Sequence, residues 1–111
     1  MSAVSLRVGI GYGLAVSVCF LTGCSSSQEH GQALFELHCA ECHAMPNPDL
    51  KKQPPKLEGL FRSKALPSGA PATDGQVRKT IIEGLSTMPA FNGRLSDTDV
   101  RDVIAYLHTL K

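Results

Sequence analysis

The clearest pattern of apolar and polar positions lies near the C-terminal end of the chain. Ser96 is a good helix N-cap, and Asp99 three residues later completes a variant of the capping box. Apolar residues then recur at the spacing i, i+3, i+4 and i+7, on one stripe of a helix: Val100, Val103, Ile104 and Leu107. The pattern predicts a helix near 96–109 that packs this stripe against a core.

Two other segments show shorter helical patterns. One follows a capping-box sequence that starts at Thr73, and Gly84 can end it, because glycine readily adopts the conformation of a C-terminal cap. The other starts at Gly31. In the first segment, Val77, Ile81 and Ile82 would share one face of a helix. In the second segment, Leu34, Phe35 and His38 would lie on neighbouring faces. We therefore expect helices near 74–84 and near 31–43, and an all-α domain with about three main helices.

Residues 45–72 separate these helices and contain six of the seven prolines. So many prolines favour irregular structure. The segment also carries Leu57, Leu60 and Phe61, apolar anchors that a flexible linker does not need. We predict an ordered, extended loop with one turn near 57–62.

The N-terminal segment has the pattern of an export signal. Arg7 is its one charged residue, and residues 8–22 form an uncharged run. A basic start before such a run is typical of a signal peptide, and the run is shorter than the roughly 20 residues of a spanning helix. It ends in Leu21-Thr22-Gly23-Cys24, which resembles a bacterial lipobox.

The lipobox resemblance implies that the chain is cut before Cys24 and that Cys24 carries lipid. Acyl chains contribute about 0.8 kcal/mol per buried CH2, so such a group anchors the protein to a membrane. An ordinary secretory peptide or an uncleaved anchor is the alternative. We expect a removed signal peptide over 1–23, a polar tether over 24–32 and a folded domain over 33–111. This domain would face the periplasm or the outer cell surface, and Ser25 in place of an aspartate favours the outer membrane.

Length, charge and aromatic content narrow the function. The 111 residues fit one small domain and are too few for a doubly wound enzyme fold with its own dinucleotide site. Eleven basic against ten acidic residues exclude a strongly basic nucleic-acid binder. Aromatic residues make up 5% of the chain, a thin supply for a core of this size, which suggests that something else fills its middle.

A cofactor could fill the middle of the core, and the segment Cys39-Ala40-Glu41-Cys42-His43 indicates which one. A Cys-x-x-Cys-His run is typical of a c-type haem attachment site, in which two thiols bond to the porphyrin edge and the histidine faces the iron. A zinc site needs four ligands, and no second cysteine pair is present. A thioredoxin-like redox pair needs strands around it, and a plain disulfide leaves His43 unexplained.

Met88 is the candidate for the sixth iron ligand. It lies in a loop between two predicted helices and precedes Pro89, so its side chain is free to project inward. Met45 is too close to His43 to reach the opposite face of a haem. His108 is the competing ligand, whereas His30 and His38 are predicted on the surface or on a helix face. A His/Met pair leaves no open iron position and raises the reduction potential, which favours electron transfer over oxygen chemistry.

The attachment motif, Met88 and the terminal helix together resemble a class I cytochrome c over nearly all of residues 31–111. The resemblance implies an all-α fold around one covalent haem c. It further implies that the first and last helices cross at Gly31, with Phe35 and Tyr106 nearby. It also implies that the carbonyl of Pro55 accepts a hydrogen bond from His43.

Charge is unevenly placed along the mature chain. Residues 45–72 carry five basic and two acidic side chains, whereas residues 25–44 carry three acidic and no basic ones, with histidine counted as neutral. The basic loop is either a docking face for an acidic partner or a solvated loop that keeps the protein soluble.

These observations predict a lipid-anchored carrier of single electrons between a redox donor and acceptor outside the cytoplasm, and not an enzyme. One alternative is a haem c subunit of a larger membrane or periplasmic oxidoreductase complex. Another is a sensor or peroxidase in which Met88 leaves the iron.

Overall fold

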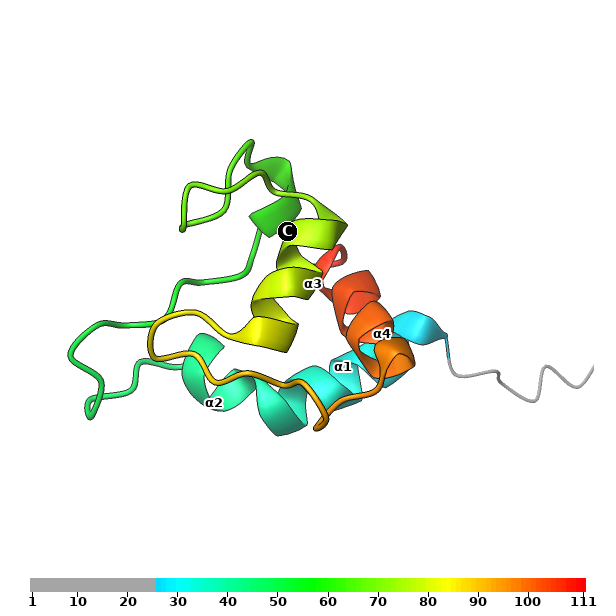
Figure 1. Ribbon diagram of the computed structural model, residues 1–111, viewed down its shortest axis with the longest axis horizontal. Helices are drawn as coiled ribbons and strands as arrows, with labels where there is room; N and C mark the ends of the chain where they lie inside the picture. The colour runs from blue at the N-terminus through cyan, green and yellow to red at the C-terminus, as the bar shows by residue number, and fades with distance from the viewer. Residues whose placement is uncertain (1–25) are drawn as a thin grey trace, which may run out of the picture.

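The structure is a computed structural model of the chain, and it describes residues 26–111. The predicted signal peptide and Cys24 lie outside the described residues. The fold is all-α, as predicted (Figure 1). Its elements are α1 (Ser27–His38), α2 (Ala40–His43), a 3-10 helix η1 (Leu60–Arg62), α3 (Asp74–Glu83) and α4 (Asp97–Leu107). None of the helices in residues 26–111 is both long and apolar enough to cross a membrane.

Helix α1 starts at Ser27, four residues before the predicted start at Gly31. Ser26 and Glu29 form a full capping box, in which the Glu29 amide donates to the Ser26 hydroxyl at 3.2 Å and the Ser26 amide donates to the Glu29 carboxylate at 3.0 Å. This motif stabilises the first turn of a helix. Residues 27–32 are therefore helical, which corrects the polar tether predicted over 24–32 at those positions.

The helix predicted over 31–43 is divided at Cys39. This residue leaves helical geometry with φ −120° and ψ −36°, so that α1 ends at His38 and the single turn of α2 follows. Hydrogen bonds continue across the break, from the Cys39 amide to the Phe35 carbonyl at 2.8 Å and from the His43 amide to the Cys39 carbonyl at 2.9 Å. The bend thus changes the direction of the chain at the Cys-x-x-Cys-His segment while the backbone hydrogen bonds on both sides are kept.

Helices α1 and α4 cross at Gly31. A Cβ atom at this position would lie 1.9 Å from the Asp102 carbonyl oxygen, so only glycine allows the two backbones to approach this closely. The rings of Phe35 and Tyr106 pack beside the crossing with centroids 5.3 Å apart and tilted by 56°. The crossing expected from the family resemblance is confirmed.

A polar contact accompanies this crossing. His30 Nδ1 donates to the Asp102 carboxylate at 2.8 Å, and the Asp102 side chain is only 7% exposed. This hydrogen bond, with help from Arg101, lowers the pKa of Asp102 below its ordinary value of 3.8. His30, predicted as a surface or helix-face residue, is half exposed and at the same time joins the two helices.

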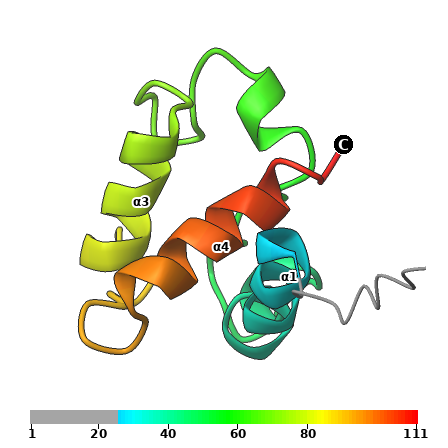
Figure 2. The same cartoon turned by 90° about the vertical axis from the view of Figure 1, so that its right-hand side faces the viewer.

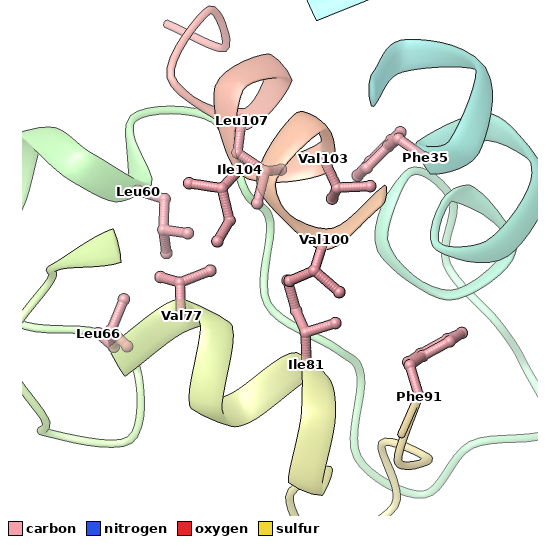
Figure 3. Close-up of a cluster of buried hydrophobic side chains, with 10 residues drawn as sticks. All are labelled: Phe35, Leu60, Leu66, Val77, Ile81, Phe91, Val100, Val103, Ile104 and Leu107. Carbon is pink, nitrogen blue, oxygen red and sulfur yellow. The ribbon is translucent and has the colours of Figure 1, made fainter. Parts of the chain in front are cut away.

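Helix α4 lies between α1 and α3 (Figure 2). Val100 and Val103 on α4 are the most deeply buried side chains, and Val77 and Ile81 of α3 point toward α4 (Figure 3). The remaining buried apolar side chains are Phe35, Leu60, Leu66, Phe91, Ile104 and Leu107. The α4 stripe, the Ser96–Asp99 capping box and the glycine end of α3 are all present as predicted.

Candidate functional site

One open pocket brings together Cys39, His43 and Met88, which come from separate parts of the sequence. About 800 Å³ of space that protein atoms do not fill lies between its walls, and part of this space is open to solvent. Its other lining residues are almost all apolar: Phe35, Pro55, Leu57, Leu60, Leu66, Pro67, Ser68, Val77, Thr80, Ile81, Leu85, Val103 and Leu107. An apolar pocket with an imidazole, a thioether and a thiol in its walls suits a porphyrin.

The α2 turn and the following loop position His43. Its Nδ1 atom donates a hydrogen bond to the Pro55 carbonyl oxygen at 2.8 Å. A carbonyl oxygen can only accept, so Nδ1 is the donor, and in the neutral ring Nε2 is then the nitrogen with the lone pair. The hydrogen bond that the family resemblance implied is present, and it fixes the orientation of the His43 ring.

A tight turn positions Met88. Gly84 ends α3 with φ +74°, and a Cβ atom there would lie 2.6 Å from the Met88 carbonyl oxygen. Leu85 and Met88 exchange backbone hydrogen bonds of 3.2 and 3.0 Å, around Ser86 at φ +55°. The Phe91 amide then donates to the Ile81 carbonyl at 3.0 Å, so the turn is tied to α3 at both ends.

The two cysteines of the motif form no disulfide and lie on and beside the pocket wall. Cys39 lines the pocket, and Cys42 lies on α2, half buried and outside the lining set. Burial, with a smaller contribution from neighbouring Cys42, raises the pKa of the Cys39 thiol to about 11. No group of three or more His, Cys, Asp or Glu side chains able to hold a metal occurs within residues 26–111.

The other ligand candidates lie away from the pocket lining. The His108 ring stacks on Phe61 with centroids 3.7 Å apart, and its Nε2 donates to Asp74 at 2.7 Å. The ring of His38 meets the edge of Phe91, and Met45 is 68% exposed. In this structure Met88 is therefore the candidate that shares a pocket with His43.

The family model for subunit III of cbb3-type cytochrome c oxidase matches residues 26–107. The chain belongs to the cytochrome c family. Cytochrome c6 from Bumilleriopsis filiformis is 34% identical over 85 residues, which cover 71% of this chain and 86% of that relative. Cytochrome c6 from Picosynechococcus sp. is 35% identical over 85 residues, 69% of this chain and 68% of the relative.

A solved structure agrees with this assignment. The crystal structure of cytochrome c6 from the diatom Phaeodactylum tricornutum matches with 32% identity and a TM-score of 0.53, and the match covers 70% of this chain and 86% of that one. The chain is thus a monohaem class I cytochrome c of the c6-like kind, an electron carrier and not an enzyme. Membership of this family implies a covalently bound haem c and redox protein partners.

Part of the cytochrome's pocket wall was not anticipated from the sequence. Leu66, Pro67 and Ser68 line the pocket from an irregular loop. The Leu66 amide donates to the Ala70 carbonyl at 2.7 Å, which closes the loop into a turn. No hydrophobic period marks these residues, so only the three-dimensional fold reveals them. Thr80 was also missed, although it lies on α3 between the predicted core positions Val77 and Ile81.

Proposed function

We propose that this cytochrome holds its haem through thioether bonds from Cys39 and Cys42, with His43 and Met88 as the axial iron ligands. The observation that carries the proposal is the presence of His43 and Met88 in the walls of one apolar pocket. The haem supplies an iron that accepts and releases one electron. If His43 and Met88 both ligate the iron, no position would stay open for oxygen or peroxide, and the thioether would raise the reduction potential.

The chain's own residues would keep this site rigid and dry. Leu57, Leu60 and Ile81 are among the apolar walls that exclude water. The Pro55 carbonyl fixes the orientation of the His43 ring, and the hydrogen-bonded turn before Met88 limits its movement. Fixed ligands change little between the oxidised and reduced states, which suits the transfer of single electrons.

We also propose that Cys24 is the lipidated N-terminus of the mature chain and anchors the domain outside the cytoplasm, facing the periplasm or the outer cell surface. The lipobox-like sequence before Cys24 supports this proposal. Ser26 is the N-cap of α1, so only Ser25 lies between Cys24 and the start of the helix. Two residue steps span at most about 7 Å, so the anchored domain would lie directly at the membrane surface.

A second function is favoured by the family model, whose description is that of an oxidase subunit. The protein would then be a haem c subunit of a larger oxidoreductase complex rather than a free carrier. Purification from membranes distinguishes the two: a free carrier separates from other proteins, whereas a subunit copurifies with a catalytic partner in fixed ratio.

Optical spectra and intact mass of the purified full-length product test the proposal. We expect a chain that starts at Cys24 and carries haem and acyl groups, with a low-spin spectrum in the reduced state and no binding of carbon monoxide. A high-spin iron that binds carbon monoxide would overturn Met88 ligation and favour a sensor or peroxidase.

A pair of cysteine variants tests the anchor separately. Cys24→Ser should move the haem protein from the membrane to the soluble fraction. The matched variant Cys19→Ser, inside the predicted signal peptide, should leave it at the membrane. An acyl-free mass for the wild type would refute the anchor and leave the haem proposal standing.

A further inference from the structure

The loop of residues 46–56, here called the basic loop, lies at the end of the domain opposite the start of α1 (Figure 1). Figure 2 shows the same domain from the side on which α1 starts, so the start of α1 faces the viewer. Lys51, Lys52 and Lys56 are exposed on this loop, and Asp49 is its one acidic residue. Glu58 follows just outside it.

The three lysines are free of carboxylate partners within residues 26–111. The ion pairs found there involve two arginines and two histidines: Arg78, Arg101, His30 and His108. With three lysines against Asp49, the basic loop therefore has a net side-chain charge of +2, and its lysines form no ion pair within residues 26–111. Unpaired like charges at one end of a molecule attract an oppositely charged surface and accelerate its encounter.

One side chain holds the basic loop in shape. Gln53 accepts a hydrogen bond from the Asn47 amide at 2.9 Å and donates to the carbonyls of Asn47 and Leu50 at 2.7 and 3.1 Å. The Asn47 side chain accepts a further bond from the Asp49 amide at 3.0 Å. A loop that is already ordered loses less conformational entropy when a partner binds, so this network favours recognition over mere solvation.

The basic loop is also continuous with the site. Lys56 directly follows Pro55, whose carbonyl holds His43. A partner bound at the loop would therefore be next to the backbone that positions a proposed iron ligand.

The position of the proposed anchor decides between two kinds of acidic partner. The 12 residues of α1 extend for about 18 Å and separate Ser26 from the Cys-x-x-Cys-His segment. If Cys24 holds the start of α1 at the membrane, the basic loop at the other end points away from the lipid. This step rests on the proposed anchor, and it favours a protein over anionic lipid headgroups, which also attract lysines.

We propose that the basic loop, through Lys51, Lys52 and Lys56, is the surface that binds an acidic patch on a redox partner protein beyond the membrane surface. Gln53 pre-orders the loop for this contact. The expected signature is binding that weakens with salt and depends on where the positive charges lie rather than on their number.

The test uses the full-length holoprotein in neutral detergent micelles, with poly-L-glutamate as the acidic probe and amide NMR shifts as the readout. Wild-type shifts should concentrate in residues 47–56. Lys51→Glu with Lys52→Glu should weaken binding about tenfold, whereas Lys79→Glu with Lys111→Glu, the same change in charge elsewhere, should weaken it about twofold or less. Gln53→Ala leaves the charge unchanged and should weaken binding about threefold.

Equal weakening by the two double variants would overturn the proposal, because total charge alone would then explain the binding. Shifts outside the basic loop would do the same. Vesicles of phosphatidylcholine with and without phosphatidylglycerol test the lipid alternative. If Lys51→Glu with Lys52→Glu weakens only the binding to vesicles that contain phosphatidylglycerol, and not the binding to poly-L-glutamate, the loop is a lipid contact instead. A low-spin spectrum of the same samples shows that the haem proposal stands in either case.

Discussion

The α1–α4 crossing and the cofactor pocket are built in opposite ways. At the crossing, protein packs directly on protein: Gly31 meets the α4 backbone, and the Asp102 side chain beside it is only 7% exposed. In the pocket, helices and loops together surround an open volume, and Leu57 and Met88 in its walls are only partly buried. Protein atoms close the first region, whereas the second region leaves room for the haem c that membership of the family implies.

The comparison explains the thin aromatic content of the sequence. Phe35 is buried at the crossing and also lines the pocket, so one side chain serves both regions. A haem would supply the flat apolar volume that extra aromatic side chains supply in other small domains. We therefore expect changes at the crossing to alter stability, and changes in the pocket to alter the iron.

The largest effect on the iron is expected from Met88→Ala. Loss of the thioether opens one axial position, so we expect carbon monoxide binding and a reduction potential lower by on the order of 100 mV, while α1 and α4 stay folded. The measurements are the optical spectrum, a redox titration and circular dichroism. Met45→Ala is the matched control, since Met45 is 68% exposed and outside the pocket lining. Unchanged ligation in the Met88 variant would refute its role.

The largest effect on stability is expected from Gly31→Ala. The added methyl group would overlap the Asp102 carbonyl at 1.9 Å, so the helices must move apart at a cost of about 3 kcal/mol in the free energy of unfolding. Gly75→Ala on α3 is the matched control, because a Cβ atom there meets nothing within 4 Å. Denaturant unfolding of the two holoproteins measures the difference, and similar midpoints would show that the crossing is not tightly packed.

A smaller, mixed effect is expected from Gly84→Ala, which strains a positive φ and meets the Met88 carbonyl at 2.6 Å. We expect a loss of about 2 kcal/mol together with partial loss of methionine ligation. Gly69→Ala also strains a positive φ, of +86°, but its Cβ would be in open space. It should cost about 1 kcal/mol and leave the spectrum unchanged. Identical spectra in both variants would show that the turn does not position Met88.

The two regions also differ in how far the sequence predicts them. At the crossing, the i, i+3, i+4, i+7 stripe of α4 and its capping box directly predicted a helix that the structure contains. The sequence prediction starts α1 four residues too late, because Ser26 and Glu29 form a capping box within a run whose polar composition is typical of a tether. The bend at Cys39 could not be predicted, since it depends on φ and ψ values that local residue preferences do not determine.

In the pocket, chemistry was more informative than periodicity. The Cys-x-x-Cys-His motif and the scarcity of methionines identified Cys39, His43 and Met88, which the structure brings to one pocket. The loop walls at Leu66 and Pro67 and the Gln53 hydrogen bonds have no repeat in sequence. The Gln53 bonds to Asn47 and Leu50 and the Leu66–Ala70 bond are local contacts, but they depend on loop conformations that no residue pattern marks.

The smallest predicted effect is a loss of stability in acid that belongs to the crossing. The hydrogen bond from His30 lowers the pKa of the folded Asp102 carboxyl below 3.8. A group with a lowered folded pKa contributes stability that is complete above its unfolded pKa and is lost as the pH falls through the folded value. We therefore expect the melting temperature of the holoprotein to decrease once the pH drops below about 4.

Asp102→Asn isolates the share of this loss that comes from Asp102. The variant should be less stable at neutral pH and should lose less stability on acidification, because its amide does not titrate. Part of the loss should persist, since backbone hydrogen bonding from Ser96 also lowers the pKa of Asp99.

Asp49→Asn in the basic loop is the control and should follow the wild type. The difference between variant and wild type cancels acid effects on the haem ligands, which both proteins share. Parallel curves for Asp102→Asn and wild type would show that the contact with His30 contributes no pH-dependent stability.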